Sequence, residues 1–272
     1  MRRLIKLLVD VGTVSSNGTA LQVTGAHDVC IIYSAETAFH HANATYQDLD
    51  SVVTGRLNKA VATGYNALRT EAIEDYQQYY NRTSINLGTS GDIGTHPVPE
   101  RHDNWQKGGN IANDVEFMAL MFNYGKYLLI QSSRPGTLPV NLQGVWNRDY
   151  TPPWDSKLTL NVNLEMNYWF AQPLDLREIA VPVVDFLDRL SVTGREVARG
   201  MYGAEGWVRC LTDSLSCKRL TTSQCCHHNT DITGYCTPYH GLTIAAPYPL
   251  GGAWVAFEAI EYFRFTRDGE FA

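Results

Sequence analysis

Apolar residues recur at three- and four-residue steps across the long segment from Leu49 to Tyr80, and this spacing limits the possible folds more than any other feature of the chain. Residues spaced in this way line one side of an α-helix, so we predict a long helix or a pair of helices here. The same spacing predicts helices over Asn113 to Gln131, with Asn113 as the N-cap, over Leu176 to Met201 and over Gly252 to Phe265. The chain is therefore expected to be mainly α-helical.

Strand-like segments are confined to the beginning of the chain. The opening residues MRRLIKLLV, Leu21 to Val23 and Val29 to Tyr33 are short β-type runs separated by turn-forming residues. Two or three strands need a partner face to be stable, so these runs predict a β remnant in front of an all-α toroid or bundle. We expect Gly88 to Asn110, which is rich in Gly, Pro, His and Asp, to form a loop without periodicity.

Charge and hydropathy exclude some partners. The 272 residues include 22 basic and 28 acidic side chains, for a net charge of −6, and neither sign forms long runs. Without a basic face, nucleic acid is not an expected partner. No apolar run approaches the roughly 18 residues of a membrane helix, so no membrane partner is expected either. Sequons at Asn17, Asn43 and Asn81 suit a secreted protein, and we therefore expect an extracellular location.

Five of the six cysteines fall between Cys210 and Cys236, close to His227 and His228. Thiolates and imidazoles are the ligands of zinc, which makes a zinc site one interpretation. Structural zinc sites normally present paired CxxC motifs, however, and none occurs here. We therefore favour ordinary cysteines and expect neither a metal nor a cofactor.

The densest mixture of amides and tryptophans lies between Leu138 and Phe170. Burying so many amides without partners would cost about 1–3 kcal/mol each, so they either form an internal network or face a polar ligand. Asn161 and Asn163 are two residues apart, and an extended backbone would direct both side chains to one face. On the pattern alone, ligand binding and loop architecture are equally good interpretations.

Five sequence blocks occur in the order found in one known family. They are YLLIQSSRPGTLPVNLQGVWN (Tyr127 to Asn147), PPWDSKLTLNVNLEMNYW (Pro152 to Trp169), MYGAEGWV (Met201 to Val208), HHNTDI (His227 to Ile232) and PLGGAW (Pro249 to Trp254). In these blocks the chain resembles glycoside hydrolase family 95, the α-L-fucosidases and α-L-galactosidases. Several blocks in a fixed order are far more specific than one short motif.

The resemblance implies hydrolysis of terminal α-1,2-linked L-fucosyl residues, with inversion, from a fucosylated oligosaccharide or glycoconjugate. Inversion needs an acid and a base roughly 6.5–9.5 Å apart, so that a water fits between them. The family holds this water with a pair of asparagines that matches Asn161 and Asn163, and the resemblance assigns Trp254 and His228 to sugar contact. The general acid Glu and the basic Asp belong to motifs that follow the GGAW block, so we expect both outside this chain. Glu165 is expected to be a buried partner that orders its loop.

The resemblance also implies a domain organisation. We expect residues 1–40 to be a remnant of an N-terminal β-sandwich, 41–90 a helical linker, and 91–272 the first part of an (α/α)6 catalytic barrel. Residues 209–225 interrupt blocks that are nearly contiguous in the family, and we interpret them as an insertion, with retained intron sequence as a hypothesis that cDNA sequencing tests. An alternative function is glycan binding without catalysis, by a degenerate fragment.

Overall fold

The computed structural model describes residues 1–38, 41, 43–109, 111–156, 158–159, 162–197, 199–200, 203, 205–206, 229–230 and 251–267. The chain divides into two compact units, Met1–Gln77 and Gln78–Ala272. Most of the described residues are helical, which confirms the predicted mainly α fold. The β-sandwich and the (α/α)6 toroid remain predictions.

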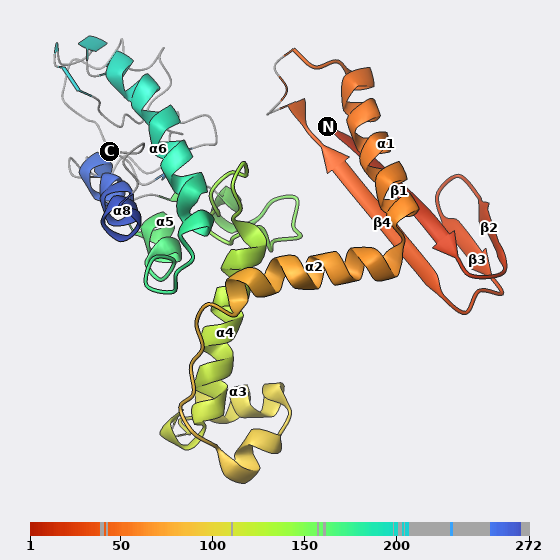
Figure 1. Ribbon diagram of the computed structural model, residues 1–272, viewed down its shortest axis with the longest axis horizontal. Coiled ribbons are helices and arrows are strands. Elements are labelled where there is room, and N and C mark those ends of the chain that lie inside the picture. Colours follow the sequence, from red (N-terminus) through yellow and green to blue (C-terminus); the bar gives the residue numbers. More distant parts are fainter. Residues whose placement is uncertain are drawn as a thin grey trace. The chain divides into compact units, whose positions relative to one another are not determined.

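The first unit contains two antiparallel strand pairs (Figure 1). Strand β1 (Arg2–Val9) pairs with β4 (Val29–Glu36) in a register that runs from Arg2 opposite Glu36 to Val9 opposite Val29. Strand β2 (Thr13–Ser16) pairs with β3 (Leu21–Thr24). The short strands predicted at the beginning of the chain are thus confirmed.

Two helices follow the strands. Helix α1 (Tyr46–Thr63) starts at a capping box formed by Thr45 and Asp48, and it packs on β1 and β4. Its buried residues Leu49, Val53 and Leu57 recur at the predicted spacing of four. Helix α2 (Tyr65–Tyr80) follows directly, and the break falls at Gly64, whose φ of +80° is a conformation that glycine adopts without strain. The prediction of a helix pair between Leu49 and Tyr80 is confirmed.

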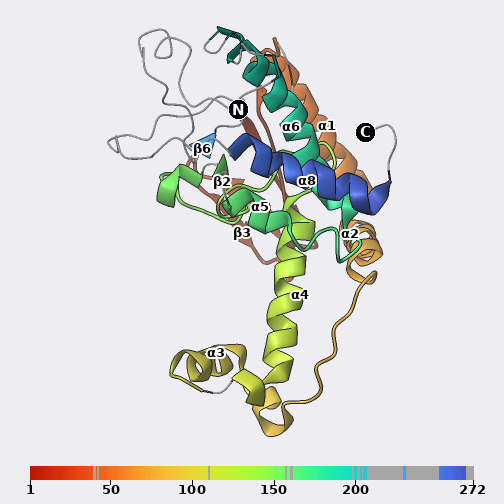
Figure 2. The same ribbon diagram turned by 90° about the vertical axis from the view of Figure 1, so that its left-hand side faces the viewer.

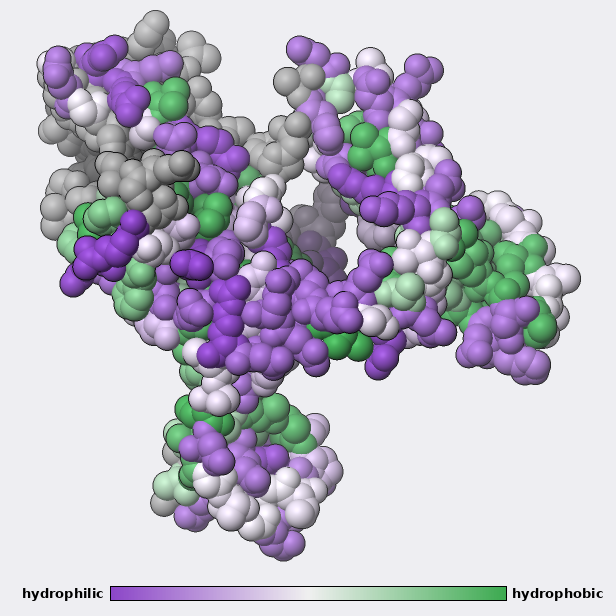
Figure 3. All heavy atoms as spheres, in the orientation of Figure 1, coloured by the Kyte–Doolittle hydropathy of each residue, from purple (hydrophilic) through white to green (hydrophobic). Residues whose placement is uncertain are grey.

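The face of the β1–β4 pair turned away from α1 is apolar and exposed. Ile5, Ile31 and Tyr33 are 57%, 66% and 56% accessible, whereas their sequence neighbours Leu4 and Ile32 are partly covered. This alternation is the period of two of a strand with one covered face. Apolar surface gathers over the strands of this unit in the space-filling view (Figure 3).

The second unit is built mainly from helices, which Figures 1 and 2 show from two sides. Its described elements are η2 (Gly91–Thr95), α3 (Val98–Gln106), η3 (Ile111–Asn113), α4 (Val115–Ser132), η4 (Pro153–Ser156), β5 (Leu158–Thr159), α5 (Asn163–Tyr168), α6 (Arg177–Val197), β6 (Asn229–Thr230) and α8 (Gly251–Thr266). The helices predicted over Asn113 to Gln131, Leu176 to Met201 and Gly252 to Phe265 are confirmed as α4, α6 and α8.

Two details of this unit differ from the sequence prediction. The segment from Gly88 to Asn110, expected to be a loop, contains η2 and α3, because Pro99 and Glu100 suit the first turn of a helix although the segment has no apolar period. The N-cap of α4 is Asp114 and not Asn113, because Asp114 has two oxygens and can pair with Arg101 while it accepts a bond from the Phe117 N–H.

The core of the second unit lies along α6. Ile179, Val183, Phe186 and Leu190 are almost completely buried, and α6 packs against α8, where Val255 is fully buried (Figure 2). Pro182 lies inside α6. Among the described residues, no helix combines the length and apolar character needed to cross a membrane.

Candidate functional site

The short helix α5 lies at the centre of the amide- and tryptophan-rich segment. Its last residue, Tyr168, is buried and forms a junction with Ser133 and Val140. The Ser133 hydroxyl donates to the Ile179 carbonyl at 2.8 Å, so the Tyr168 hydroxyl donates to Ser133 Oγ at 2.8 Å and accepts from the Val140 N–H at 2.9 Å. Burial raises the pKa of Tyr168 to about 12. The phenol therefore stays neutral and fixes α5 against the preceding loop.

Several of the amides satisfy each other. Gln143 Oε1 accepts from Asn147 Nδ2 at 2.7 Å and from Ser156 Oγ at 2.9 Å. Asn167 Nδ2 donates to the Asn141 carbonyl at 3.3 Å. Hydrogen bonds within the loop thus explain part of the amide pattern. They use the oxygen of the Gln143 amide and the nitrogen of the Asn167 amide.

Asn163, one of the two predicted water-holding residues, is the first residue of α5 and is half-buried. The extended backbone expected around it therefore does not continue through Asn163. Its predicted partner Asn161 lies outside the described residues, so their shared face stays a prediction. Glu165, two residues further along α5, is completely buried, and the burial predicted for it is confirmed.

A short strand pairing brings two of the sequence blocks together. Leu158 and Thr159 of β5 lie opposite Thr230 and Asn229 of β6, so the PPWDSKLTLNVNLEMNYW block meets the HHNTDI block. Three features of the sequence lie outside the described residues: His228, which is predicted to contact sugar, the cysteine cluster, and the interruption at 209–225. Among the residues described, no group of three potential ligands for a metal ion is found.

Trp254, the other predicted sugar-contacting residue, lines a pocket of about 470 Å³ between α5 and α8. The lining is mainly aromatic, with Trp169, Phe257 and Phe265 beside Trp254. Two carboxyl groups, Glu258 and Glu261, and the amide of Gln172 add polar atoms. Aromatic walls with a few polar groups are the usual chemistry of a site for a small neutral ligand.

Glu258 has the most perturbed acidity in this pocket. Burial, together with repulsion from Glu165 and Glu261, raises the pKa of Glu258 to about 7, although a hydrogen bond from the Trp169 side chain opposes the shift. A carboxyl group with this pKa is partly protonated near neutral pH and can donate a hydrogen bond to a hydroxyl. The sequence analysis missed Glu258. Its signal was the four-residue step from Trp254, which places both side chains on one face of α8.

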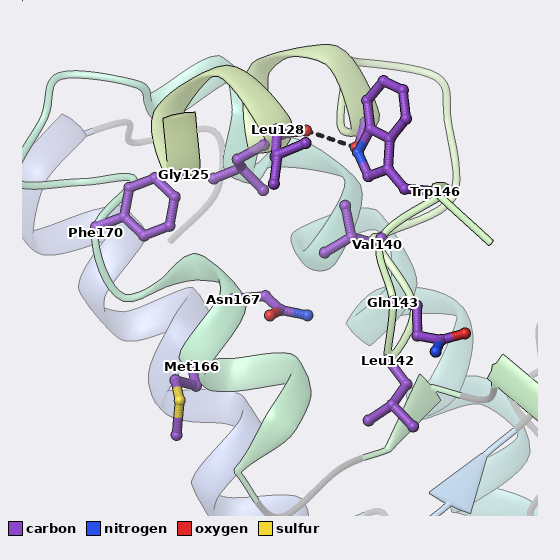
Figure 4. A pocket seen from close by; sticks show the side chains of 12 residues that line it. Gly125, Leu128, Val140, Leu142, Gln143, Trp146, Met166, Asn167 and Phe170 are labelled. Atoms are coloured by element: carbon purple, nitrogen blue, oxygen red, sulfur yellow. Dashed lines mark hydrogen bonds between the residues drawn. The ribbon is translucent and has the colours of Figure 1, made fainter. Parts of the chain in front are cut away.

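A second pocket, of about 290 Å³, lies on the other side of α5 (Figure 4). It is formed by α4, by the loop from Val140 to Trp146, and by Met166, Asn167 and Phe170. Asn167 projects from the side of α5 opposite to Trp169, because residues two positions apart lie on opposite sides of a helix. Trp254 and Asn167 therefore line different pockets.

This part of the chain is thus a helical domain with two candidate ligand pockets, whose linings combine aromatic side chains with a few amide and carboxyl groups. The Glycosyl hydrolase family 95 catalytic domain matches residues 64–272. The chain belongs to this family, and the predicted family membership is confirmed.

The chain is also similar to curated relatives. It is 34% identical to Alpha-L-fucosidase 2 of Arabidopsis thaliana over 269 residues, which cover 96% of this chain and 29% of that protein. It is 27% identical over 263 residues to Probable alpha-fucosidase A of Aspergillus niger, covering 93% of this chain and 30% of the relative. A Probable alpha-fucosidase A of Aspergillus oryzae is 29% identical over 203 residues. The chain thus spans less than a third of the length of the relatives it matches.

Proposed function

We propose that this chain is part of a glycoside hydrolase that removes terminal L-fucosyl residues, α-1,2-linked, from oligosaccharides or glycoconjugates. The observation that carries the proposal is the family match over residues 64–272, together with relatives named as fucosidases. The aromatic pocket around Trp254 supports it, since the apolar faces of a sugar ring pack on indoles while its hydroxyl groups need polar partners.

Within this proposal the described residues supply binding and orientation. Trp254 would stack on the fucosyl ring, and protonated Glu258 would donate to one of its hydroxyl groups. Asn163, with Asn161, would hold and polarise the attacking water, because a carboxamide cannot accept the proton itself at neutral pH. The general acid Glu and the basic Asp would come from sequence beyond this chain, and His228 would add a sugar contact.

The proposal is tested by assaying two proteins on fucosyl-α1,2-galactose and on its L-galactosyl analogue. One is this chain, and the other is this chain extended by the segment that follows the matched region in the Arabidopsis relative. We expect the extended protein to release L-fucose and the present chain to bind L-fucose without turnover. NMR of the first product should show the β-anomer, as inversion requires. An extended protein that folds and releases no L-fucose contradicts the assignment.

The same comparison of the two proteins distinguishes hydrolysis from the alternative function, glycan binding without catalysis. The alternative predicts that the extended protein binds the disaccharide and leaves it intact. Replacing Trp254 with Ala should weaken L-fucose binding under either function. For the extended protein, the hydrolase proposal predicts that Asn163→Ala causes a large loss of kcat with little change in KM, because Asn163 would act on the water and not on the sugar. The alternative predicts no hydrolysis with or without this substitution.

We also propose an extracellular location. All three sequon asparagines, Asn17, Asn43 and Asn81, are exposed and thus accessible to glycosylation. Expression through a eukaryotic secretory pathway, followed by enzymatic removal of N-glycans, should lower the mass of the protein, and the Asn81→Gln variant should carry one glycan fewer. Protein that is retained inside the cells and carries no glycan would contradict the proposal.

A further inference from the structure

We propose that Asn17 is a site of spontaneous deamidation, at which the backbone nitrogen of Gly18 attacks the asparagine side chain in a turn whose hydrogen bonds promote the reaction. Asn17 is the only asparagine among the 272 residues that is followed directly by glycine. It begins the exposed turn, residues 17–20, that joins β2 to β3 in the first unit (Figure 1). No residue assigned to the proposed hydrolysis lies in this unit.

The nucleophile is the backbone nitrogen of Gly18, which two features leave able to react. Gly18 has a φ of +90°, and no atom lies within 4 Å of the position that a Cβ would take, so the approach to the nitrogen is open. Among the described residues, its N–H has a single acceptor, Ser16 Oγ, at 3.3 Å. A hydroxyl group both accepts and donates, so Ser16 can pass the proton of this N–H to water as the new bond forms.

The electrophile is the side-chain amide of Asn17, and the turn polarises it. Asn17 Oδ1 accepts from the Ala20 N–H at 2.8 Å, and from the Thr19 N–H and Thr19 Oγ1 at 3.2 Å each. These bonds fold the side chain toward the residues that follow it, the side on which the Gly18 nitrogen lies. Donors that point at a carbonyl oxygen stabilise the negative charge that develops there when a nucleophile adds to the carbon. The three bonds therefore favour attack at Asn17 Cγ.

The reaction balances with water as its one co-reactant. The bond between Gly18 N and Asn17 Cγ forms, the bond between Cγ and Nδ2 breaks, and Nδ2 leaves as ammonia with the proton that Gly18 loses. Water then opens the five-membered imide at either carbonyl, which gives aspartate or isoaspartate. Within the part of the chain that the structure describes, Asn17 Nδ2 makes no hydrogen bond, so its departure breaks no other contact.

The same nitrogen atom would carry an N-glycan, because Asn17, Gly18 and Thr19 form a sequon. A glycosylated Nδ2 cannot leave as ammonia, so the glycan and the new carboxyl group exclude each other at this residue. This step rests on the proposed extracellular location. A chain that escapes glycosylation at Asn17 would instead gain one negative charge in the turn.

The test uses the unglycosylated chain from a bacterial host, incubated at mildly alkaline pH. Deamidation is followed by mass spectrometry of peptides, and isoaspartate by enzymatic methyl labelling. We expect Asn17 to react at least about tenfold faster than Asn81, which is also exposed but is followed by arginine. This ratio corresponds to about 1.4 kcal/mol in activation free energy.

Two substitutions test the contribution of the turn. Thr19→Val removes one donor to Asn17 Oδ1, and Ser16→Ala removes the acceptor of the Gly18 N–H. Each should slow the reaction about threefold, as expected for one hydrogen bond in contact with water. The matched control is Ser15→Ala, at the neighbouring exposed position of β2, which should leave the rate unchanged. Far-UV circular dichroism of each variant verifies the fold.

The outcomes decide the inference without reference to hydrolysis. An Asn17 amide that survives as long as that of Asn81 overturns it, and so do rates that both Ser16→Ala and Thr19→Val leave unchanged. Protein glycosylated at Asn17 in a eukaryotic host should show no deamidation there, and loss of its glycan-bearing amide at the rate of the bare chain would contradict the mutual exclusion. Since none of these measurements involves L-fucose, the proposed hydrolase stands or fails separately.

Discussion

Tyr168 joins three segments that are distant in the sequence. Its hydroxyl connects α5 to Ser133 at the end of α4 and to Val140 in the following loop, and Ser133 continues the chain of bonds to Ile179 in α6. All of these atoms are buried, so water cannot replace a lost bond. One side chain therefore holds the loop and the helix that carry both pockets.

Replacing Tyr168 with Phe should lower the free energy of unfolding by about 1–3 kcal/mol, because the Val140 N–H and Ser133 Oγ lose their buried partner. The measurement is urea denaturation followed by circular dichroism. Tyr150→Phe is the matched control, since Tyr150 is fully exposed, and it should change the stability by no more than about 0.5 kcal/mol. Equal effects of the two substitutions would contradict the junction.

Glu258 makes stability depend on pH. Its pKa is about 7 in the folded chain and near 4.5 without the fold, so the folded state binds the proton more tightly. The contribution of Glu258 to stability is therefore most favourable below about pH 4.5 and declines as the pH rises to 7, by an amount on the order of 1–2 kcal/mol once solvent screening of this partly exposed group is included. Glu258→Gln should remove this decline in denaturation measured from pH 4 to 8. An exposed control, Glu71→Gln, should keep it.

At the scale of elements, the start of α4 shows how a cap is stabilised. Asp114 accepts from Arg101 at 2.7 and 2.9 Å, from Ser90 Oγ at 2.7 Å and from the Phe117 N–H at 3.2 Å. The bonds from Arg101 lower the pKa of Asp114 to about 2, with Ser90 and Phe117 contributing. The ion pair is mostly buried, with Arg101 only 8% accessible. It fixes α3 to the first turn of α4.

Asp114→Ala should cost about 2–3 kcal/mol of unfolding free energy, because it removes the cap and leaves the Arg101 cation buried without its partner. Asn113→Ala, at the neighbouring exposed position that the sequence favoured as the cap, should cost less than about 0.5 kcal/mol. In the wild type, the contribution of Asp114 is present above about pH 3.8 and is lost as the pH falls toward 2. Thermal melts of the two variants at pH 7 and pH 3 test both statements.

The periodic elements were the predictable part of this fold. Helices α1, α4, α6 and α8 bury one side, so their apolar residues repeat at helical steps that can be read from the sequence. Helix α3 escaped prediction because only Arg101 is buried in it, and a helix without a buried apolar stripe has no period. The choice of Asp114 over Asn113 depends on an arginine thirteen residues earlier, which local patterns do not reveal.

The candidate site was predictable to a lesser degree. The tryptophans and amides of the segment around Asn163 stand out in composition, and Trp254 followed from its block. Trp254 and Asn167 line pockets on opposite sides of α5, and this arrangement depends on tertiary packing. The raised pKa of Glu258 likewise arises from burial and from Glu165, and Glu165 comes into range only when α5 and α8 pack together.

At the scale of the whole molecule, the exposed apolar face of the β1–β4 pair should limit solubility. Ile5 and Ile31 lie on the face opposite to α1, and open apolar surface of this kind promotes association. The double substitution Ile5→Thr and Ile31→Thr keeps β-branched residues and should raise the saturation concentration while reducing binding of an apolar dye.

A matched control is Val14→Thr, on β2 outside the β1–β4 pair, which should change neither quantity. We also expect the wild-type chain to unfold with low cooperativity. A sharp, reversible melt of a soluble monomer would contradict this expectation and the importance of the exposed face.

Helix α5 spans only the residues Asn163–Tyr168, yet it contributes to the walls of both pockets. So short an element has few backbone hydrogen bonds of its own, and a shift of it toward one pocket would change the walls of both. A ligand that displaces it on one side must therefore alter affinity on the other, and thermodynamic reciprocity requires the second ligand to alter the affinity of the first by the same factor. Titrations with two ligands together would then deviate from the sum of the separate titrations. The deviation would measure the free energy with which α5 couples the two pockets.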